Sequence, residues 1–186
     1  MIPDIKKFKK RLKELNAKLL FSYEFTDYYY KPKNSKPWDP QIQSLRLRKW
    51  IIGRKNGSEI LFTKDETIRK DGIIFKKSVY PGGKILLFKG SLDRCKRFLN
   101  DLGFEEWFKI IKKDCRVFKI LEYNFEIVYE YIETLGWTGE IEIECFDLRK
   151  VADDLKKILS ILKIPKNKIS FKSLGRLYAE RLGYIK

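Results

Sequence analysis

Apolar residues recur every three or four positions in several segments of the chain, which is the spacing of an amphipathic helix. One predicted helix spans roughly residues 4–17, with lysines between its apolar positions. Ser91 precedes a second helical segment and Asp147 precedes a third, and both residue types favour the N-cap position. A short fourth helix is expected from about Ser173 to Leu182.

Between the predicted helices, apolar and polar residues form stretches of strand length. The predicted strands are 18–30, 44–52, 58–66, 73–80, 84–88, 105–118, 124–132 and 139–145. The turn signal Pro81-Gly82-Gly83 predicts a hairpin in which 73–80 pairs with 84–88. The segment 31–40 contains three prolines and is expected to be a loop.

Two of the predicted strands carry charges on one face and aliphatic side chains on the other. Glu140, Glu142 and Glu144 alternate with isoleucines, and Arg46 and Arg48 alternate with leucines. Amphipathic helices can cover only the outside of a sheet, and a sheet of many antiparallel strands tends to curl and close. We therefore expect an α+β fold in which helices surround an antiparallel barrel with charged inner walls. A sheet with one solvated face is the alternative.

The two halves of the chain follow the same order of a helix, a long strand and further strands, which suggests an internal duplication. The second helix follows the strand 84–88, whereas only Met1-Ile2-Pro3 precedes the first. By this symmetry a first strand is missing, and the barrel is expected to be open or incomplete there. Exposed strand edges are normally covered or paired, so a covered edge or a homodimer through the open edge is expected.

Length and composition narrow the class of protein. The 186 residues are most simply one domain, 1–186, and 44% of them are hydrophobic, which argues against a disordered chain. No apolar run is long enough for a signal peptide or a membrane span, and the three cysteines are scattered, so we expect a cytoplasmic protein with reduced thiols. The chain contains no histidine, which excludes His-based triads and the usual zinc sites.

The net charge of +16 predicts a polyanionic partner. Inside a barrel, basic strands would bind a phosphate chain, and the glutamates would hold a divalent cation or act as a general base. The lysine- and glutamate-rich composition is also typical of a thermophile's solvated surface. RNA binding by the basic segment 6–13 or the aromatic run Tyr28-Tyr29-Tyr30 is a further alternative.

Several short motifs occur in an order that is typical of a known superfamily. They are "FTDYYY" (25–30), "SLRLRK" (44–49), "LFTKDE" (61–66), "LDRCKRFLNDLGF" (92–104), "KKDCRVF" (112–118), "YEYIETLGWTGEIEIE" (129–144) and "ISFKSL" (169–174). On these motifs the chain resembles the CYTH superfamily, whose triphosphate tunnel fold is shared by class IV adenylate cyclases, thiamine triphosphatases and inorganic triphosphatases.

The resemblance implies roles for individual residues. The basic residues it assigns to triphosphate binding are Arg46, Arg48, Lys64, Lys77, Lys113 and Arg116. It also implies that Glu130, Glu140 and Glu142 are ligands of Mg²⁺ or Mn²⁺, and that Glu140 and Glu142 take part in catalysis.

The chain departs from the family at three places. The ExExK signature of the first strand is missing before Asp4, no glutamate accompanies Lys76 and Lys77 in the strand before the second helix, and Cys115 stands where an arginine is expected. The departures have two explanations: a truncated or misplaced start, or a divergent member that binds without turnover.

The expected function follows from the motifs and the departures together. We expect a protein that binds a triphosphate-containing compound in a basic tunnel, with possible metal-dependent triphosphatase or adenylate cyclase activity that is weak or absent without ExExK. The alternatives are a non-catalytic polyphosphate or nucleotide binder and an RNA-binding protein. No membrane partner is expected.

Overall fold

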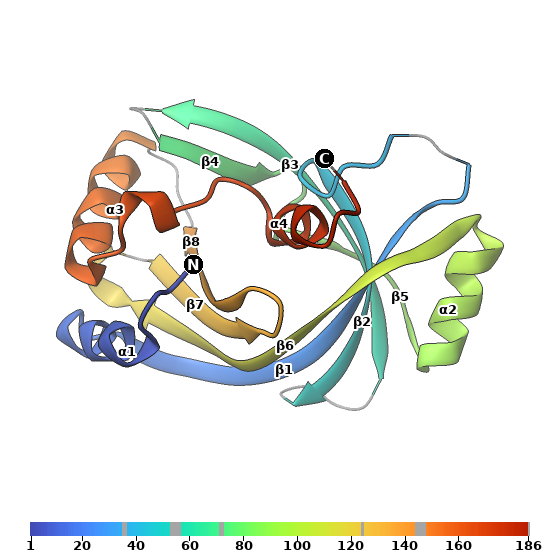
Figure 1. Cartoon of the computed structure of the whole chain (residues 1–186), viewed down its shortest axis with the longest axis horizontal. Helices are drawn as coiled ribbons and strands as arrows, with labels where there is room; N and C mark the ends of the chain where they lie inside the picture. Colours follow the sequence, from blue (N-terminus) through green and yellow to red (C-terminus); the bar gives the residue numbers. More distant parts are fainter. Residues whose placement is uncertain (35–36, 53–56, 71–72, 124, 144–147, 186) are drawn as a thin grey trace. The chain divides into compact units, whose positions relative to one another are not determined.

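The computed structural model describes residues 1–34, 37–52, 57–70, 73–123, 125–143 and 148–185. Within these ranges the α-helices are α1 (Ile5–Glu14), α2 (Leu92–Asp101), α3 (Leu148–Leu162) and α4 (Leu174–Arg181) (Figure 1). The strands are β1 (Lys18–Pro32), β2 (Gln43–Ile52), β3 (Ser58–Lys70), β4 (Ile73–Ser78), β5 (Ile85–Gly90), β6 (Phe104–Ile120), β7 (Phe125–Ile132) and β8 (Gly136–Ile143). None of the helices in the described ranges is long and apolar enough to span a lipid bilayer.

The strands form one sheet in the order β4-β3-β2-β1-β6-β7-β8, and β5 also pairs with β3. The pairs β1–β2, β2–β3, β3–β5 and β7–β8 are antiparallel. The described part of the order ends at β4 and at β8, and no pairing among the described residues closes it into a full barrel. The expected α+β fold, with an antiparallel sheet that is open at its edges, is therefore confirmed.

The predicted hairpin at Pro81-Gly82-Gly83 is wrong. A turn does lie there, because Gly83 N donates to Tyr80 O (3.1 Å), but β4 and β5 do not pair with each other. Both pair with β3 instead. The strand β3 has 13 residues, which is long enough to accept two six-residue partners along its length.

By its internal packing the chain divides into two compact units. The first consists of Met1–Tyr23, Arg69–Phe75 and Lys113–Phe171, and the second of Glu24–Ile68, Lys76–Lys112 and Lys172–Lys186. The long strands β1 and β6 contribute residues to both units. The expectation of a single domain stays a prediction.

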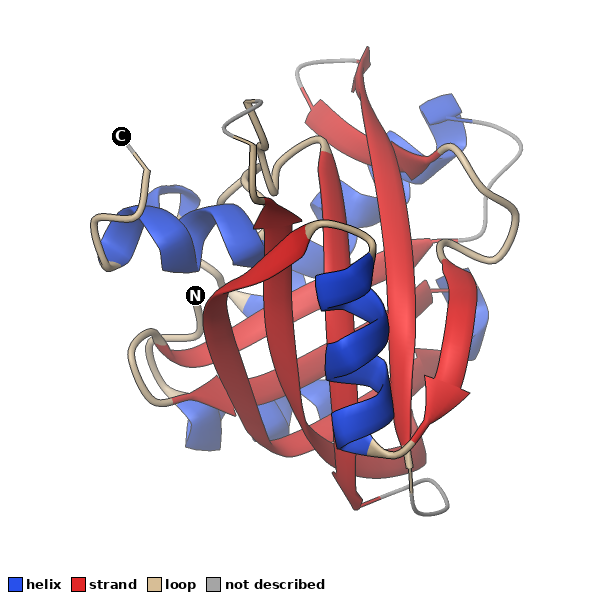
Figure 2. Cartoon of the chain, turned by 90° about the vertical axis from the view of Figure 1, so that its right-hand side faces the viewer, coloured by secondary structure: helices blue, strands red, loops and turns tan. Residues whose placement is uncertain are grey.

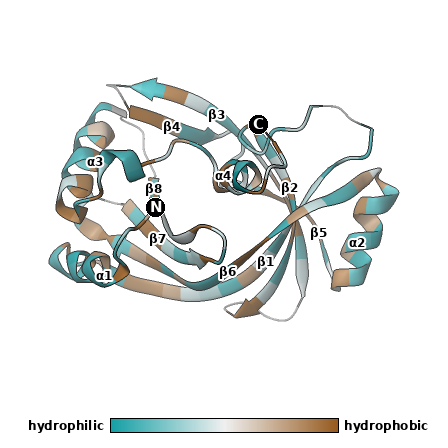
Figure 3. Cartoon of the chain, viewed as in Figure 1, coloured by the Kyte–Doolittle hydropathy of each residue, from teal (hydrophilic) through white to brown (hydrophobic). Residues whose placement is uncertain are grey.

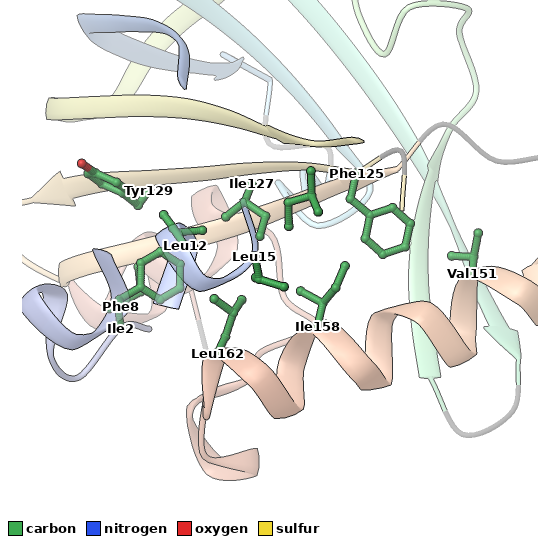
Figure 4. Close-up of a cluster of buried hydrophobic side chains, with 11 residues drawn as sticks. Ile2, Phe8, Leu12, Leu15, Phe125, Ile127, Tyr129, Val151, Ile158 and Leu162 are labelled. Carbon is green, nitrogen blue, oxygen red and sulfur yellow. The ribbon is translucent and has the colours of Figure 1, made fainter. Parts of the chain in front are cut away.

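The core of the first unit lies between α1, α3 and the strands β7 and β8 (Figure 4). Its fully or nearly buried residues are Ile2, Phe8, Leu12, Leu15, Ile120, Phe125, Ile127, Tyr129, Val151, Ile158 and Leu162. Phe8 meets the ring of Tyr129 edge-on at 6.2 Å between centroids, and Arg11 Nη1 donates to Leu162 O (2.7 Å). The apolar stripes that predicted α1 and α3 therefore face a common core.

The same core anchors the residues that precede α1. Ile2 N donates to Trp137 O of β8 (2.8 Å), and the Ile2 side chain covers Gly139, where an added Cβ would lie 3.1 Å from Ile2 Cδ1. Within the described residues, this segment bonds to β8 without forming a strand of its own.

The core of the second unit lies between α2 and one face of β2 and β3. Its buried residues are Tyr30, Leu45, Leu47, Ile60, Cys95 and Leu99. Ser91 caps α2 as predicted, since its side chain accepts a hydrogen bond from Arg94 N. Figure 2 shows α2 nearest the viewer, lying along the strands that it covers. The predicted outer, apolar face of these strands is thus confirmed in this unit.

Replacement of Leu99 in α2 by Ala tests this packing. The Leu99 side chain is fully buried, so the cavity left by Leu99→Ala should lower the free energy of unfolding by about 2–5 kcal/mol. The matched control is Leu102→Ala at the end of the same helix, where 56% of the residue is exposed and a change of about 0.5 kcal/mol or less is expected. Urea unfolding followed by circular dichroism measures both, and equal losses would contradict this packing.

Candidate anion-binding site

A charged face of the second unit is built from β1 and β2. In the antiparallel register, Asp27 lies opposite Arg48 and Tyr29 lies opposite Arg46. Directly opposed residues project from the same side of a sheet, so all four share one face. The intervening Leu47 is buried on the other face, against α2. Hydrophilic and hydrophobic bands alternate along the strands in Figure 3. The predicted separation of the arginines from the leucines is confirmed.

Asp27 is the centre of this face and is fully buried. Arg48 binds it with two parallel hydrogen bonds, from Nε to Oδ1 (2.7 Å) and from Nη2 to Oδ2 (2.8 Å). Arg46 Nη1 lies farther away, 3.5 Å from Oδ2. Burial by itself would raise the pKa of Asp27, but the charges of Arg48, Arg46 and Lys112 and the Arg48 hydrogen bonds hold this pKa below its ordinary value of 3.8. Asp27 is therefore ionised at neutral pH.

Aromatic rings hold the cations in place. The Arg48 guanidinium carbon lies 3.6 Å from the ring centroid of Phe25 and 5.2 Å from that of Trp50. Lys112 Nζ of β6 lies 5.5 Å from the Phe25 centroid, and Arg46 lies 5.9 Å from that of Tyr29. These distances allow cation–π attraction, which is stronger away from water. We call Asp27, Arg46, Arg48 and Lys112 the Asp27 cluster.

The Asp27 cluster contains three cations and one carboxylate, and each residue is buried or nearly so. The neighbouring Glu59 does not balance this excess alone, because Lys89 Nζ lies 3.6 Å from its Oε1. Arg46 Nε is buried and has no hydrogen-bond partner among the described residues. Buried cations and donors are normally matched by acceptors. The cluster therefore has the charge and the donor to accept an anion.

The helix α4 covers one end of this face. Phe108 of β6 stacks on Tyr29 at 4.6 Å and on Tyr178 of α4 at 5.7 Å between centroids. A Cβ at Gly175 would lie 2.8 Å from Tyr29 Cε1, so the helix can approach this closely only with glycine there. Ser173 Oγ donates to Pro40 O (2.7 Å) and so fixes the start of α4.

The structure places the remaining predicted ligands of the second unit elsewhere. Lys64 lies opposite Gln43, on the face that Ile60 and Phe62 present to α2, and its side chain is exposed. It does not join Arg46 and Arg48. Lys77 of β4 is also exposed.

Two predicted basic ligands belong to the first unit. Lys113 is exposed, whereas its neighbour Lys112 is the buried lysine of the Asp27 cluster. Arg116 Nε donates to Asp114 Oδ1 (3.2 Å). Asp114 has a left-handed backbone (φ +46°), which marks an irregularity in β6. Cys115, at the position where an arginine was expected, is buried.

The predicted acidic residues lie on one face of β7 and β8 in the first unit. Glu130 is opposite Thr138, and Glu142 is opposite Glu126, while Ile141 packs against the core on the other face. The alternation inferred from the sequence is thus confirmed for the described residues, and Glu144 lies outside them. Glu130 is fully buried, whereas Glu140 and Glu142 are exposed.

Glu130, Glu140 and Glu142 are also the residues predicted to bind Mg²⁺ or Mn²⁺. In the part of the chain that the structure describes, no three Asp, Glu or Cys side chains gather closely enough to hold a metal ion. We therefore assign no chemical step to a metal. The metal and catalytic roles of Glu130, Glu140 and Glu142 stay predictions.

Comparison with solved structures places the fold. PH1819 from Pyrococcus horikoshii superposes with a TM-score of 0.71 at 18% identity, over 95% of this chain and 94% of that one. A proposed adenylate cyclase from Vibrio parahaemolyticus superposes with a TM-score of 0.61 at 16% identity, over 98% of this chain and 93% of that one. HpAC1 from Hippeastrum is a proposed adenylyl cyclase with a dominant triphosphatase activity. It superposes with a TM-score of 0.56 at 12% identity, over 100% of this chain and 94% of that one. The chain shares the fold of these structures, as the resemblance to the CYTH superfamily implies.

At the level of sequence, no protein-family model and no curated protein matches the chain. The shared fold covers nearly the whole length of the chain and of its structural neighbours, as the motifs predicted. The motifs did not single out Asp27 or Lys112, although both lie within quoted segments. The strand alternation places Asp27 on one face of β1, but only the register between β1 and β2 shows that it lies opposite Arg48.

Proposed function

We propose that the chain binds a compound that carries a triphosphate chain, and that the Asp27 cluster contacts its phosphate oxygens. The observation that carries this proposal is the buried Arg46 Nε, which has no hydrogen-bond partner among the described residues and lies in a cluster with Arg48 and Lys112. Phosphate oxygens are strong acceptors, and arginine binds them with directed, charge-assisted hydrogen bonds. The fold shared with a triphosphatase and proposed adenylate cyclases supports the same class of ligand.

The distribution of the cations supports a long anion rather than a single phosphate. Arg46 and Arg48 lie on β2 and Lys112 lies on β6, and these strands flank β1 on its two sides. Strands two apart in a sheet are separated by about 10 Å. A chain of three phosphates can contact both sides at once, whereas a single phosphate engages one side.

Calorimetry with inorganic triphosphate, ATP, AMP and phosphate tests the proposal. We expect triphosphate and ATP to bind at least about tenfold more tightly than AMP or phosphate, because each additional charge-assisted hydrogen bond contributes about 1.5–3 kcal/mol. The titrations are made in EDTA, so that the cationic side chains alone account for the affinity. Equal affinity for AMP and ATP would overturn the proposal.

Two further measurements separate the alternatives. Tighter binding of single-stranded RNA than of triphosphate, with a steep dependence on salt, would favour the RNA-binding reading. Phosphate release from triphosphate in Mg²⁺ or Mn²⁺ distinguishes an enzyme from a binder. Little release is expected, because the described carboxylates do not gather into a metal site.

A further inference from the structure

The two arginines of the Asp27 cluster have different surroundings. Arg48 makes two short hydrogen bonds to Asp27, and its guanidinium lies close to the Phe25 ring, so its orientation is fully determined. Arg46 has a single contact to Asp27 at 3.5 Å, and its Nε has no partner among the described residues. Arg46 can therefore turn to a ligand without breaking a short hydrogen bond, whereas Arg48 cannot.

Asp27 lies deeper than the cations that surround it. Its side chain is 0% exposed, whereas the side chains of Arg48 and Arg46 are 8% and 16% exposed. A ligand that approaches from the solvent therefore meets the guanidinium groups before the carboxylate. The carboxylate already offsets the mutual repulsion of the three cations when no ligand is bound.

From this arrangement we infer that Asp27 is a built-in counter-anion that competes with the ligand for Arg46 and thereby sets the affinity of the site. This inference rests on the proposed function of the Asp27 cluster. The charge of Asp27 lowers the positive potential at Arg46, so a ligand with a single phosphate meets a weakened field. A ligand with several phosphates carries enough negative charge to bind in spite of the Asp27 carboxylate. Asp27 thus acts as the specificity-determining residue that excludes weakly charged anions.

The variant Asp27→Asn tests this inference, because it removes the charge and keeps the size of the side chain. A neighbouring charge acts strongly on a buried anion, so we expect the variant to bind inorganic triphosphate about tenfold more tightly than the wild type. Binding of inorganic phosphate should also become measurable. The matched control is Asp101→Asn, an exposed carboxylate at the end of α2, which should leave both affinities unchanged.

The outcomes distinguish this inference from the proposed function. A merely structural role of Asp27 predicts unchanged or weaker binding by Asp27→Asn, and either result would overturn the inference. If wild-type protein shows no preference for triphosphate, the proposed function is wrong, and a gain of anion binding in Asp27→Asn would still support the counter-anion role.

A second measurement covers the case in which Asp27→Asn folds poorly. A bound anion would replace the missing carboxylate, so inorganic triphosphate should raise the melting temperature of Asp27→Asn by more than it raises that of the wild type. An equal or smaller shift, or a variant that stays unfolded in millimolar triphosphate, would show that Asp27 serves the fold alone and would contradict the inference.

Discussion

Arg46→Gln is expected to weaken the binding of inorganic triphosphate by about 10- to 100-fold, the loss that corresponds to one or more hydrogen bonds to a charged group. Arg46 carries the buried Nε that lacks a partner among the described residues, and its one contact to Asp27 is long. The free energy of unfolding should change little, because removal of Arg46 leaves the short Asp27–Arg48 pair intact. Calorimetry and urea unfolding of the same samples measure both effects.

The matched control for Arg46→Gln is Arg97→Gln. Arg97 is exposed on α2 of the same unit, so this variant loses the same charge without touching the Asp27 cluster. A similar loss of affinity in both variants would mean that general electrostatic attraction, rather than a directed contact from Arg46, accounts for the binding.

Arg48→Gln is expected to have a large effect on stability, with a loss of about 3–5 kcal/mol in the free energy of unfolding. The variant leaves the fully buried Asp27 without both of its short hydrogen bonds. An unpaired buried charge costs far more than the pair contributes. Urea unfolding at neutral pH measures the loss, and a change below about 1 kcal/mol would show that Arg46 and Lys112 suffice to hold Asp27.

A double-mutant cycle separates the pair from its surroundings. If the loss of stability in Arg48→Gln comes from the buried Asp27 carboxylate that has lost its partner, the addition of Asp27→Asn should restore part of the stability. Neither side chain then carries a charge. Additive losses would indicate that Arg48 stabilises the unit through Phe25 and Trp50 instead. The two arginines, two residues apart on one strand, are thus expected to differ, with Arg46 serving the ligand and Arg48 the fold.

The sequence by itself determined the features that depend on local spacing. The apolar stripes located α1, α2 and α3, since residues three or four apart must share a helix face. Ser91 and Ser173 were recognised as N-caps or helix starts, because a serine side chain can reach the backbone N–H three residues on. Alternation likewise assigned Arg46 and Arg48 to one face of β2, because successive side chains of any strand point to opposite sides.

Only the tertiary structure decided which strands are neighbours and in what register. The turn between β4 and β5 has the residues of a hairpin, yet both strands pair with β3, whose 13 residues are enough for two six-residue partners. Lys64 follows the predicted motif but lies on the α2 side of β3. Lys112 and Lys113 are adjacent in sequence, and tertiary packing buries only the first.

The centre of the candidate site belongs to this second class of features. Asp27 and Arg48 are 21 residues apart and meet because the register of β1 and β2 places them opposite each other. No local spacing encodes that pairing. The periodicity of the sequence therefore determined which side chains share a face. The register of the folded sheet determined which charged side chains become partners, because electrostatic interactions depend on distance in space rather than along the chain.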